Sequence, residues 1–261
     1  MIARRDPAGR YDRTGMQSRQ SVPAVPVALW LAVSAWGAGQ GDAAPVRVQL
    51  VTGGHSHEIS FYDAFHGNPD FAIDVNPHPG AFHSDLRKSV DVLVLYDMAD
   101  ADSEVERQHL REFLEAGKGM VVLHHAIIDN QHWPWWYAEV VGGRYLLQAE
   151  GEQRASSYEH GVKLKIHPVG PHPITDGIGK FEIVDEVYNY MWRSPGARVL
   201  LEADKPEGEK AVAWIGPWEK SRVVAIQLGH GREAHENPNF RKLLRNAILW
   251  AARRLPEGSS R

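Results

Sequence analysis

The chain has 261 residues, of which 43% are hydrophobic and 24% are charged, a composition typical of a globular protein and not of a disordered or collagen-like chain. Its 33 acidic residues outnumber its 29 Lys and Arg residues, so a net charge of -4 offers no basic surface for nucleic acid, and none is expected as a partner. The absence of cysteine excludes disulfide bonds, thiolate zinc sites and a cysteine nucleophile.

Residues 1–44 have the pattern of a secretory signal peptide or an N-terminal anchor. Arg19 precedes an apolar run over residues 27–38, and small residues follow at Gly41 and Ala44. This run is shorter than the roughly 20 apolar residues of a transmembrane helix, so no stable membrane span is predicted. We therefore expect export to the periplasm or the medium, and a folded domain over residues 45–261.

From residue 46 onward, short apolar runs alternate with helical patterns, which is typical of an α/β sheet. Ser103 and Glu106 have the spacing of a capping box, so a helix is predicted to begin there and to end at Gly117. The other predicted elements of this half are strands over residues 46–51, 71–75, 91–96 and 120–123 and a helix over residues 58–66.

The second half of the chain has more predicted strand than helix. Several of its strands alternate apolar and polar residues, which indicates an antiparallel extension of the sheet. No stretch is polar enough to serve as a linker, so one domain is expected. The predicted elements are strands over residues 162–167, 181–184, 198–202, 211–215 and 223–228 and a helix over residues 239–254.

Histidines and a carboxylate follow four of the predicted strands. In an open parallel sheet the ligand crevice lies beyond the carboxyl ends of the strands, so these side chains are expected to converge there. Each histidine alone is equally consistent with a surface or core position. The residues are His55, His57, Asp97, His124, His125 and His230.

Aromatic and acidic residues near these strand ends extend the candidate site. Trp133 belongs to a run of four aromatic residues whose flat faces suit sugar rings, although a buried aromatic cap has the same pattern. Glu186 could act as a general acid or base, or be one of a solvated acidic pair, and Tyr188 lies close to it in sequence. Trp214 precedes a Gly-Pro turn and could bind substrate or only pack.

Six segments in this order together resemble the ThuA-like family, which is named for a trehalose-utilisation protein. They are residues 117–126, 133–143, 172–175, 185–188, 212–214 and 228–230. The resemblance implies a flavodoxin-like fold similar to class I glutamine amidotransferases, a three-layer α/β sandwich with a mostly parallel sheet and added antiparallel strands. It also implies a role in the breakdown of disaccharides through 3-keto sugars.

The chain departs from these relatives at two places. Amidotransferases of this fold carry a nucleophilic cysteine at a strand-to-helix elbow, whereas His124 and His125 occupy that turn here, so glutamine hydrolysis by that route is excluded. ThuA-like proteins also tend to carry a histidine shortly after the paired glycines, where this chain has Gln148.

A 3-keto glycoside has an acidic hydrogen on C2, so a base can start elimination of the C1 leaving group, after which water adds. Glu186 or His124 could be the base, and His57 or His230 the acid. The substrate-binding candidates are His55, Asp97, His125, Trp133, Tyr188 and Trp214. We expect His124 at the edge of the crevice, where its replacement would cost about 1 kcal/mol of stability or less.

Other interpretations of the sequence stay open. A divalent metal held by histidines could polarise the ketone, although no close-spaced metal motif is present, and the sequence gives no nucleotide or flavin signal. Self-association into a homo-oligomer is also open. The alternatives to an enzyme are a non-catalytic exported sugar-binding protein and a structural domain without a site.

Overall fold

The computed structural model describes residues 44–101, 103–205 and 210–258. Its main feature is a nine-stranded sheet, accompanied by a separate pair of short strands. The sheet consists of β1 (Val46–Gly53), β2 (Phe71–Val75), β3 (Val92–Asp97), β4 (Gly119–Leu123), β6 (Ser157–Pro168), β7 (Phe181–Asn189), β9 (Arg198–Ala203), β10 (Ala211–Ile215) and β11 (Val223–Ile226), and the short pair is β5 (Gly143–Arg144) and β8 (Trp192–Arg193).

The strand order divides the sheet into two halves. Strands β2-β1-β3-β4-β11 are parallel and have the order 2-1-3-4-5 of flavodoxin-like folds. Strands β10-β9-β6-β7 continue the sheet with antiparallel pairings. We call these the parallel half and the antiparallel half. The α/β fold with its added antiparallel strands is therefore confirmed.

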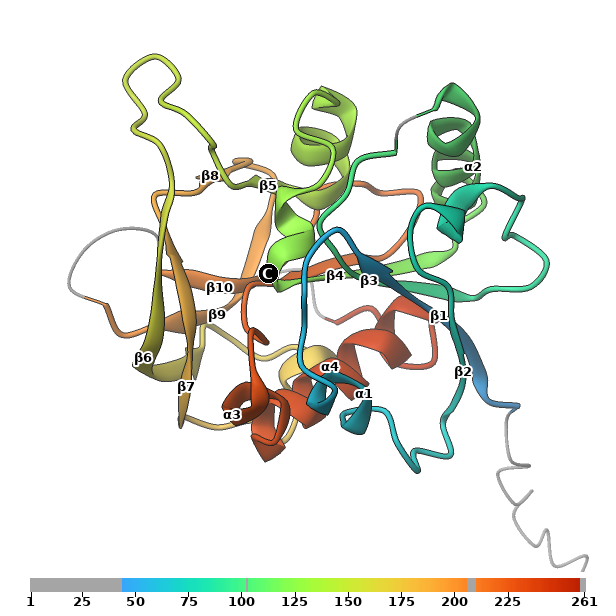
Figure 1. The fold of residues 1–261 in the computed structure, drawn as a ribbon. Coiled ribbons are helices and arrows are strands. Elements are labelled where there is room, and N and C mark those ends of the chain that lie inside the picture. Colours follow the sequence, from blue (N-terminus) through green and yellow to red (C-terminus); the bar gives the residue numbers. More distant parts are fainter. Residues whose placement is uncertain (1–43, 102, 206–209, 259–261) are drawn as a thin grey trace, which may run out of the picture. The chain divides into compact units, whose positions relative to one another are not determined.

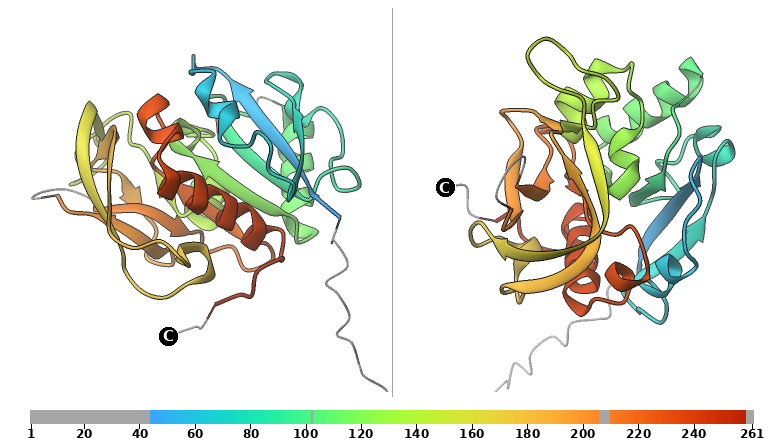
Figure 2. Two further views of the ribbon diagram at one scale, coloured as in Figure 1. Left: turned by 90° about the horizontal axis from the view of Figure 1, so that it is seen from below. Right: turned by 60° about the vertical axis from the view of Figure 1, so that its left-hand side comes forward.

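Helices cover both faces of the sheet and complete three layers (Figure 1). One face packs under α1 (Ser60–Asp63), α3 (Arg232–His235) and α4 (Pro238–Ala251), and Figure 2 shows α4 lying along the sheet. The other face packs under α2 (Glu104–Glu115) and the short helices η2 (His124–Ile128) and η3 (Trp135–Val141, a π-helix). Two more short helices are η1 (Gly80–Phe82) and η4 (Pro173–Thr175).

Strand β3 shows why these residues form a central strand. Val92 and Val94 pack into the core beneath α4, whereas Leu93 and Leu95 pack into the core beneath α2. A strand with apolar neighbours on both faces needs a continuous apolar run. Helix α2 begins with the predicted capping box, because the Ser103 hydroxyl accepts from the Glu106 backbone at 3.2 Å.

Some elements differ from the predictions. The helix expected over residues 58–66 is only one turn, α1, and its N-cap residue Ile59 offers no side-chain hydrogen bond to hold a longer helix. Strand β6 begins at Ser157 and not at residue 162. The sequence predicted the later start because the first residues of β6 are exposed and show no alternation of apolar and polar residues. The π-helix and the β5-β8 pair were not predicted from the sequence.

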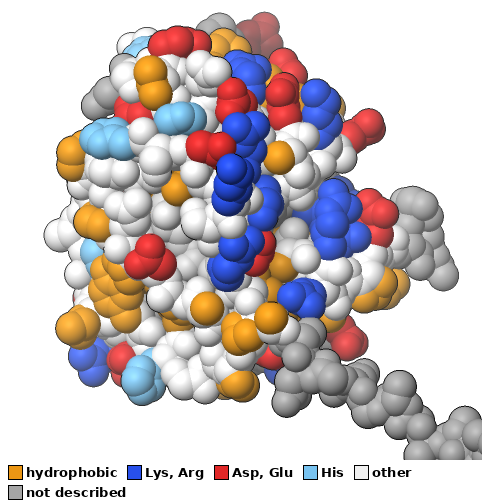
Figure 3. All heavy atoms as spheres, turned by 90° about the vertical axis from the view of Figure 1, so that its right-hand side faces the viewer, with side chains coloured by type: hydrophobic (Ala, Val, Ile, Leu, Met, Phe, Trp, Pro, Cys, Tyr) orange, Lys and Arg blue, Asp and Glu red, His pale blue; other side chains and the backbone are white. Residues whose placement is uncertain are grey.

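Residues 1–44, predicted as a signal peptide or anchor, lie almost wholly outside the described residues. Within the described ranges, no helix combines the length and the apolar character needed to cross a membrane. The face that carries β1, β2 and α2 has a band of Lys and Arg side chains with acidic side chains beside them (Figure 3). Ion pairs such as Arg47–Asp91, at 2.7 Å, neutralise part of this charge.

Candidate functional site

The site is built around a strained turn at the end of β4. All five residues of β4 are buried, and the chain then turns through His124, which has a φ of 48° and is fully buried. A non-glycine residue at positive φ costs free energy and persists only where the surroundings hold it, which is common at functional sites. The turn after β4 thus holds His124 in a strained backbone conformation.

Hydrogen bonds to the main chain set the tautomer of His124. Its Nδ1 lies 2.6 Å from the carbonyl oxygen of Gln227, and because a carbonyl only accepts, Nδ1 carries the proton. Nε2 then faces the site, where it lies 3.1 Å from the Tyr188 hydroxyl and 3.2 Å from the Glu186 carboxylate. Burial and the charge of Glu186 raise the pKa of Tyr188 well above its ordinary value, which keeps this hydroxyl protonated.

Glu186 enters the site from β7, in the antiparallel half. Its carboxylate lies 3.2 Å from His124 Nε2 and 3.7 Å from His230 Nδ1, and only 6% of the side chain is exposed. Burial alone would raise the pKa of Glu186, but the hydrogen bond and charge of His124, with those of His230 and His160, hold it below its ordinary value. Glu186 is therefore a buried carboxylate kept ionised by imidazoles.

Asp185, next to Glu186, joins the two halves of the sheet. It accepts backbone N–H groups from Gly229 at 2.7 Å, His230 at 2.9 Å and Glu186 at 2.9 Å. Burial nevertheless raises the pKa of Asp185 above its ordinary value. The bonds from Gly229 and His230 hold the loop after β11 against β7, so Asp185 positions His230 beside Glu186.

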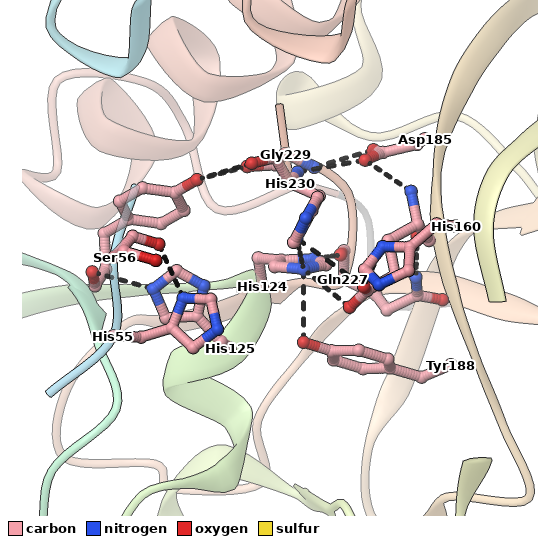
Figure 4. A network of polar contacts seen from close by, with 12 residues as sticks. His55, Ser56, His124, His125, His160, Asp185, Tyr188, Gln227, Gly229 and His230 are labelled. Carbon is pink, nitrogen blue, oxygen red and sulfur yellow. Dashed lines mark hydrogen bonds and ion pairs between the residues drawn. The ribbon is translucent and has the colours of Figure 1, made fainter. Parts of the chain in front are cut away.

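Three possible ligand atoms meet at this point: His124 Nε2, a carboxylate oxygen of Glu186 and His230 Nδ1, all within 4.8 Å of one another (Figure 4). Lone pairs that converge in a buried place repel unless a proton or a cation lies between them. Nitrogen and oxygen donors suit zinc or manganese, and the carbonyl that fixes the His124 tautomer is a typical outer partner of a metal-bound histidine. The donor set therefore fits either proton transfer or a divalent ion.

His125 and His55 form a second pair beside this cluster (Figure 4). The His125 Nε2–H donates to the carbonyl of Tyr96 at 3.0 Å, and its ring centre lies 4.8 Å from that of His55. Burial lowers the pKa of His125 to about 3, so this imidazole is neutral. The ring centre of His55 lies 6.4 Å from that of His230, which places the pair at the border of the cluster.

Two residues expected at the site have partners elsewhere. His57 lies 3.0 Å from the hydroxyl of Tyr62 and packs against Tyr96, outside the cluster around His124. Asp97 is buried and lies 2.7 Å from His78. Burial raises the pKa of both Asp97 and its neighbour Asp129, with which it shares a hydrogen bond, so the pair retains a proton.

The tryptophan candidates also pack within the protein. Trp133 stacks on Trp136 with ring centres 5.7 Å apart, and the Arg111 guanidinium lies 5.6 Å from its ring. Trp214 is 1% exposed, donates to the carbonyl of Val141 at 2.9 Å and packs against Gly143. In the described residues neither ring touches the histidine cluster, whereas Tyr188 does.

Sequence reasoning missed His160. Its Nδ1 lies 2.6 Å from Glu186, and its ring centre lies 5.0 Å from that of His230. The predicted strand began after this residue, so nothing placed it opposite Glu186. Gln148, which the sequence analysis singled out, is exposed.

A cavity of about 1710 Å³ lies elsewhere, along α4 and η4. Its lining includes His172 and Asn246, whose polar side-chain atoms bond backbone groups of the same region. None of the predicted site residues lines it.

Comparisons with known proteins concern the fold and the family of this chain. Similar solved structures include ThuA-like proteins from Parabacteroides merdae (18% identity, TM-score 0.70, covering 83% of this chain and 92% of that one) and Bacteroides uniformis (19% identity, TM-score 0.62, covering 83% and 95%). A β-galactosidase from Bacillus circulans shares the fold at 12% identity and a TM-score of 0.54, covering 78% of this chain and 31% of that one.

At these identities the structural likeness concerns the fold alone. A search of curated proteins finds no match. The family described as trehalose utilisation matches residues 47–251, which is most of the sequence and includes every residue of the histidine cluster. The chain therefore belongs to the trehalose-utilisation (ThuA) family, and its role is related to carbohydrate.

Proposed function

We propose that the protein is an enzyme that cleaves 3-keto disaccharides or related 3-keto glycosides by elimination and hydration. The observation that carries this proposal is the meeting of Glu186, His124 and His230 in one buried cluster that opens to solvent at His230. These are the groups that acid/base chemistry needs, and His124 Nε2 lies 3.2 Å from Glu186 and 3.0 Å from His230 Nδ1.

Glu186 is the base in this proposal. It is ionised and lies at the boundary between the buried His124 and the half-exposed His230. Its carboxylate takes the proton from C2, and the electron pair of that C–H bond forms the enolate of the 3-ketone. The enolate then expels the leaving-group oxygen from C1, which gives a C1=C2 double bond.

His230 is the acid that protonates this leaving oxygen. Its side chain is 32% exposed, which suits a group that must exchange protons with water and meet a departing alcohol. Water then adds across C1=C2, so the net reaction is hydrolysis. His124 and Tyr188 orient Glu186 and the substrate from the buried side.

A divalent ion is compatible with the same residues. His124, Glu186 and His230 would hold it, and it would polarise the ketone oxygen. Purified protein stripped with a chelator and then supplied with zinc or manganese separates the two forms of the proposal, because only the metal-dependent form regains activity with the ion.

The test is incubation with 3-keto trehalose and with unmodified trehalose, followed by analysis of released glucose and 3-ketoglucose. Cleavage of the keto sugar alone is the expected result, since only the ketone acidifies the C2 hydrogen. Saturable binding of sugars without turnover would instead support the non-catalytic sugar-binding protein.

We also propose that the protein is exported, on the basis of the signal-like sequence before Ala44. N-terminal sequencing of protein from a periplasmic fraction should find a mature end near that residue. An intact Met1 or Met16 in a soluble cytoplasmic pool would contradict export.

A further inference from the structure

A β-bulge lies where β6 passes the candidate site. The successive pairs between the strands are Tyr158 with Tyr188, Glu159 with Val187, and Val162 with Asp185. His160 and Gly161 therefore both lie opposite Glu186. Gly161 has a φ of 64°, a conformation that glycine adopts without strain. Bulges of this kind re-aim side chains near functional sites.

The bulge places an exposed imidazole over a buried carboxylate. The His160 side chain is 61% exposed, yet its Nδ1 lies 2.6 Å from Glu186, which is 6% exposed. Because the carboxylate only accepts, Nδ1 donates to it, and the other ring nitrogen stays available to a hydroxyl of a ligand. Among the described residues, Glu186 is the hydrogen-bonding partner of His160.

Tyr158 lies on the same side of the sheet as the site. Residues directly opposite in an antiparallel pair point to the same face, and Tyr158 is opposite Tyr188, whose hydroxyl reaches His124. The Tyr158 side chain is 56% exposed, and its ring centre lies 5.2 Å from that of His160. The exposed ring of Tyr158 and the exposed imidazole of His160 thus lie together at the outer edge of the cluster.

The exposure of the site residues gives the direction in which a ligand extends. It rises from His124 at 0% through Glu186 at 6% and His230 at 32% to His160 at 61%. A ring that reacts at Glu186 would have its remaining substituent directed toward His160 and Tyr158.

We propose that Tyr158 and His160 form the binding surface for the second ring of a disaccharide, the ring that departs on cleavage. The Tyr158 ring stacks on the apolar face of that sugar, and the ring nitrogen of His160 that does not face Glu186 hydrogen-bonds a hydroxyl. The assignment of this ring as the leaving group rests on the proposed function, whereas the preference for two rings over one does not.

Binding of unmodified trehalose and of methyl α-glucoside, measured by calorimetry, tests this surface without turnover, since neither sugar has the ketone. We expect trehalose to bind about tenfold more tightly than the single-ring glycoside, the size of one aromatic stacking contact. Tyr158→Ala should weaken trehalose binding by about the same factor and leave methyl α-glucoside unchanged. Tyr158→Phe should recover most of the preference.

Two matched pairs control this experiment. Val105 on α2 is also exposed, at 57%, so Val105→Ala should change neither affinity. No atom lies within 4 Å of a Cβ built on Gly161, so substitutions there differ only through the backbone. Asn tolerates positive φ and a β-branched residue does not, so Gly161→Asn should keep the preference and Gly161→Val should lose it.

Equal affinity for the two sugars in the wild type, binding of neither sugar, or equal weakening of both by Tyr158→Ala would each overturn the proposal. An intact preference in a protein that cleaves no 3-keto sugar would support this surface and refute the proposed reaction. Cleavage of 3-keto trehalose without a preference for two rings would have the opposite meaning.

Discussion

The two halves of the sheet contribute to the site in different ways. The parallel half supplies His124 and His230 from the loops that directly follow β4 and β11. The antiparallel half supplies Glu186, Tyr188 and His160 from within β7 and β6. The cluster therefore depends on both halves and on Asp185, which bonds one to the other.

This difference shows what each type of strand can offer. Carboxyl ends of parallel strands meet at one edge, so residues after them converge whatever their side chains. Residues inside an antiparallel strand reach a site only if register and bulges direct them there. The following variants separate the two contributions.

The largest expected effect is that of Glu186→Gln in the antiparallel half. The amide keeps the shape but cannot take a proton, so turnover of 3-keto trehalose should fall on the order of 1,000-fold, within the range for general bases. Glu182→Gln on the same strand is the matched control, because Glu182 is exposed and pairs with Lys163. Equal activity of both variants would remove Glu186 from the reaction.

In the parallel half, His124→Asn should lower turnover about 100-fold, since it removes the imidazole that holds Glu186. Asn tolerates the positive φ, so the change tests chemistry more than backbone strain. The structure corrects the expectation that His124 lies at the edge of the crevice, because the residue is fully buried and hydrogen-bonded. Urea unfolding should therefore show a loss of about 2 kcal/mol, not 1 kcal/mol or less. A variant with wild-type turnover would make His124 purely structural.

Asp185→Asn tests the connection between the halves. The amide oxygen can still accept from His230 and Glu186, but its NH2 group would face the N–H of Gly229. We expect a loss of about 2 kcal/mol in the free energy of unfolding, the cost of a buried charged hydrogen bond. Turnover should also fall as His230 shifts, and the fall should appear mainly in kcat. Unchanged stability would show that the loop after β11 holds its place without this carboxylate.

The smallest effect concerns Asp129, in the parallel half and away from the site. Burial and the charge of Asp97 raise its pKa, so the folded protein holds the proton more tightly than the unfolded chain. Its stabilising effect is present below the ordinary pKa of about 3.9 and is lost as the pH rises through the raised value. Asp129→Asn cannot lose a proton, so it should be about 1 kcal/mol more stable than wild type at pH 8, with no gain at pH 4. Parallel thermal-unfolding curves at both pH values would contradict this assignment.

Most of the fold could be predicted from the sequence, because buried strands and amphipathic helices leave periodic apolar patterns. The run before Asp97 and the capping box at Ser103 are examples. Strand β6 was harder, since its first residues are polar on both faces and owe their place to pairing with β7. The residues of one strand do not by themselves show which other strand pairs with it.

The candidate site could be predicted in part for the same reason. His124 directly follows an apolar strand, and His230 follows another after a short loop. Glu186 and Tyr188 belong to one of the segments that resemble the ThuA-like family. His160 could not be predicted as a site residue, because its position depends on the extra residue at Gly161. Trp133 packs against Trp136 and Asp97 lies beside His78, and a residue type in the sequence does not distinguish such packing from a binding surface.

The bond from His124 to the carbonyl of Gln227 has a consequence for how the protein can vary. The acceptor belongs to the main chain, so no substitution of the Gln227 side chain can remove it. The direction in which His124 Nε2 points therefore does not depend on which side chain stands at position 227. In a library that replaces each residue in turn, position 227 should accept more side chains than position 124 or 186. The backbone of the fold therefore sets the orientation of the His124 ring.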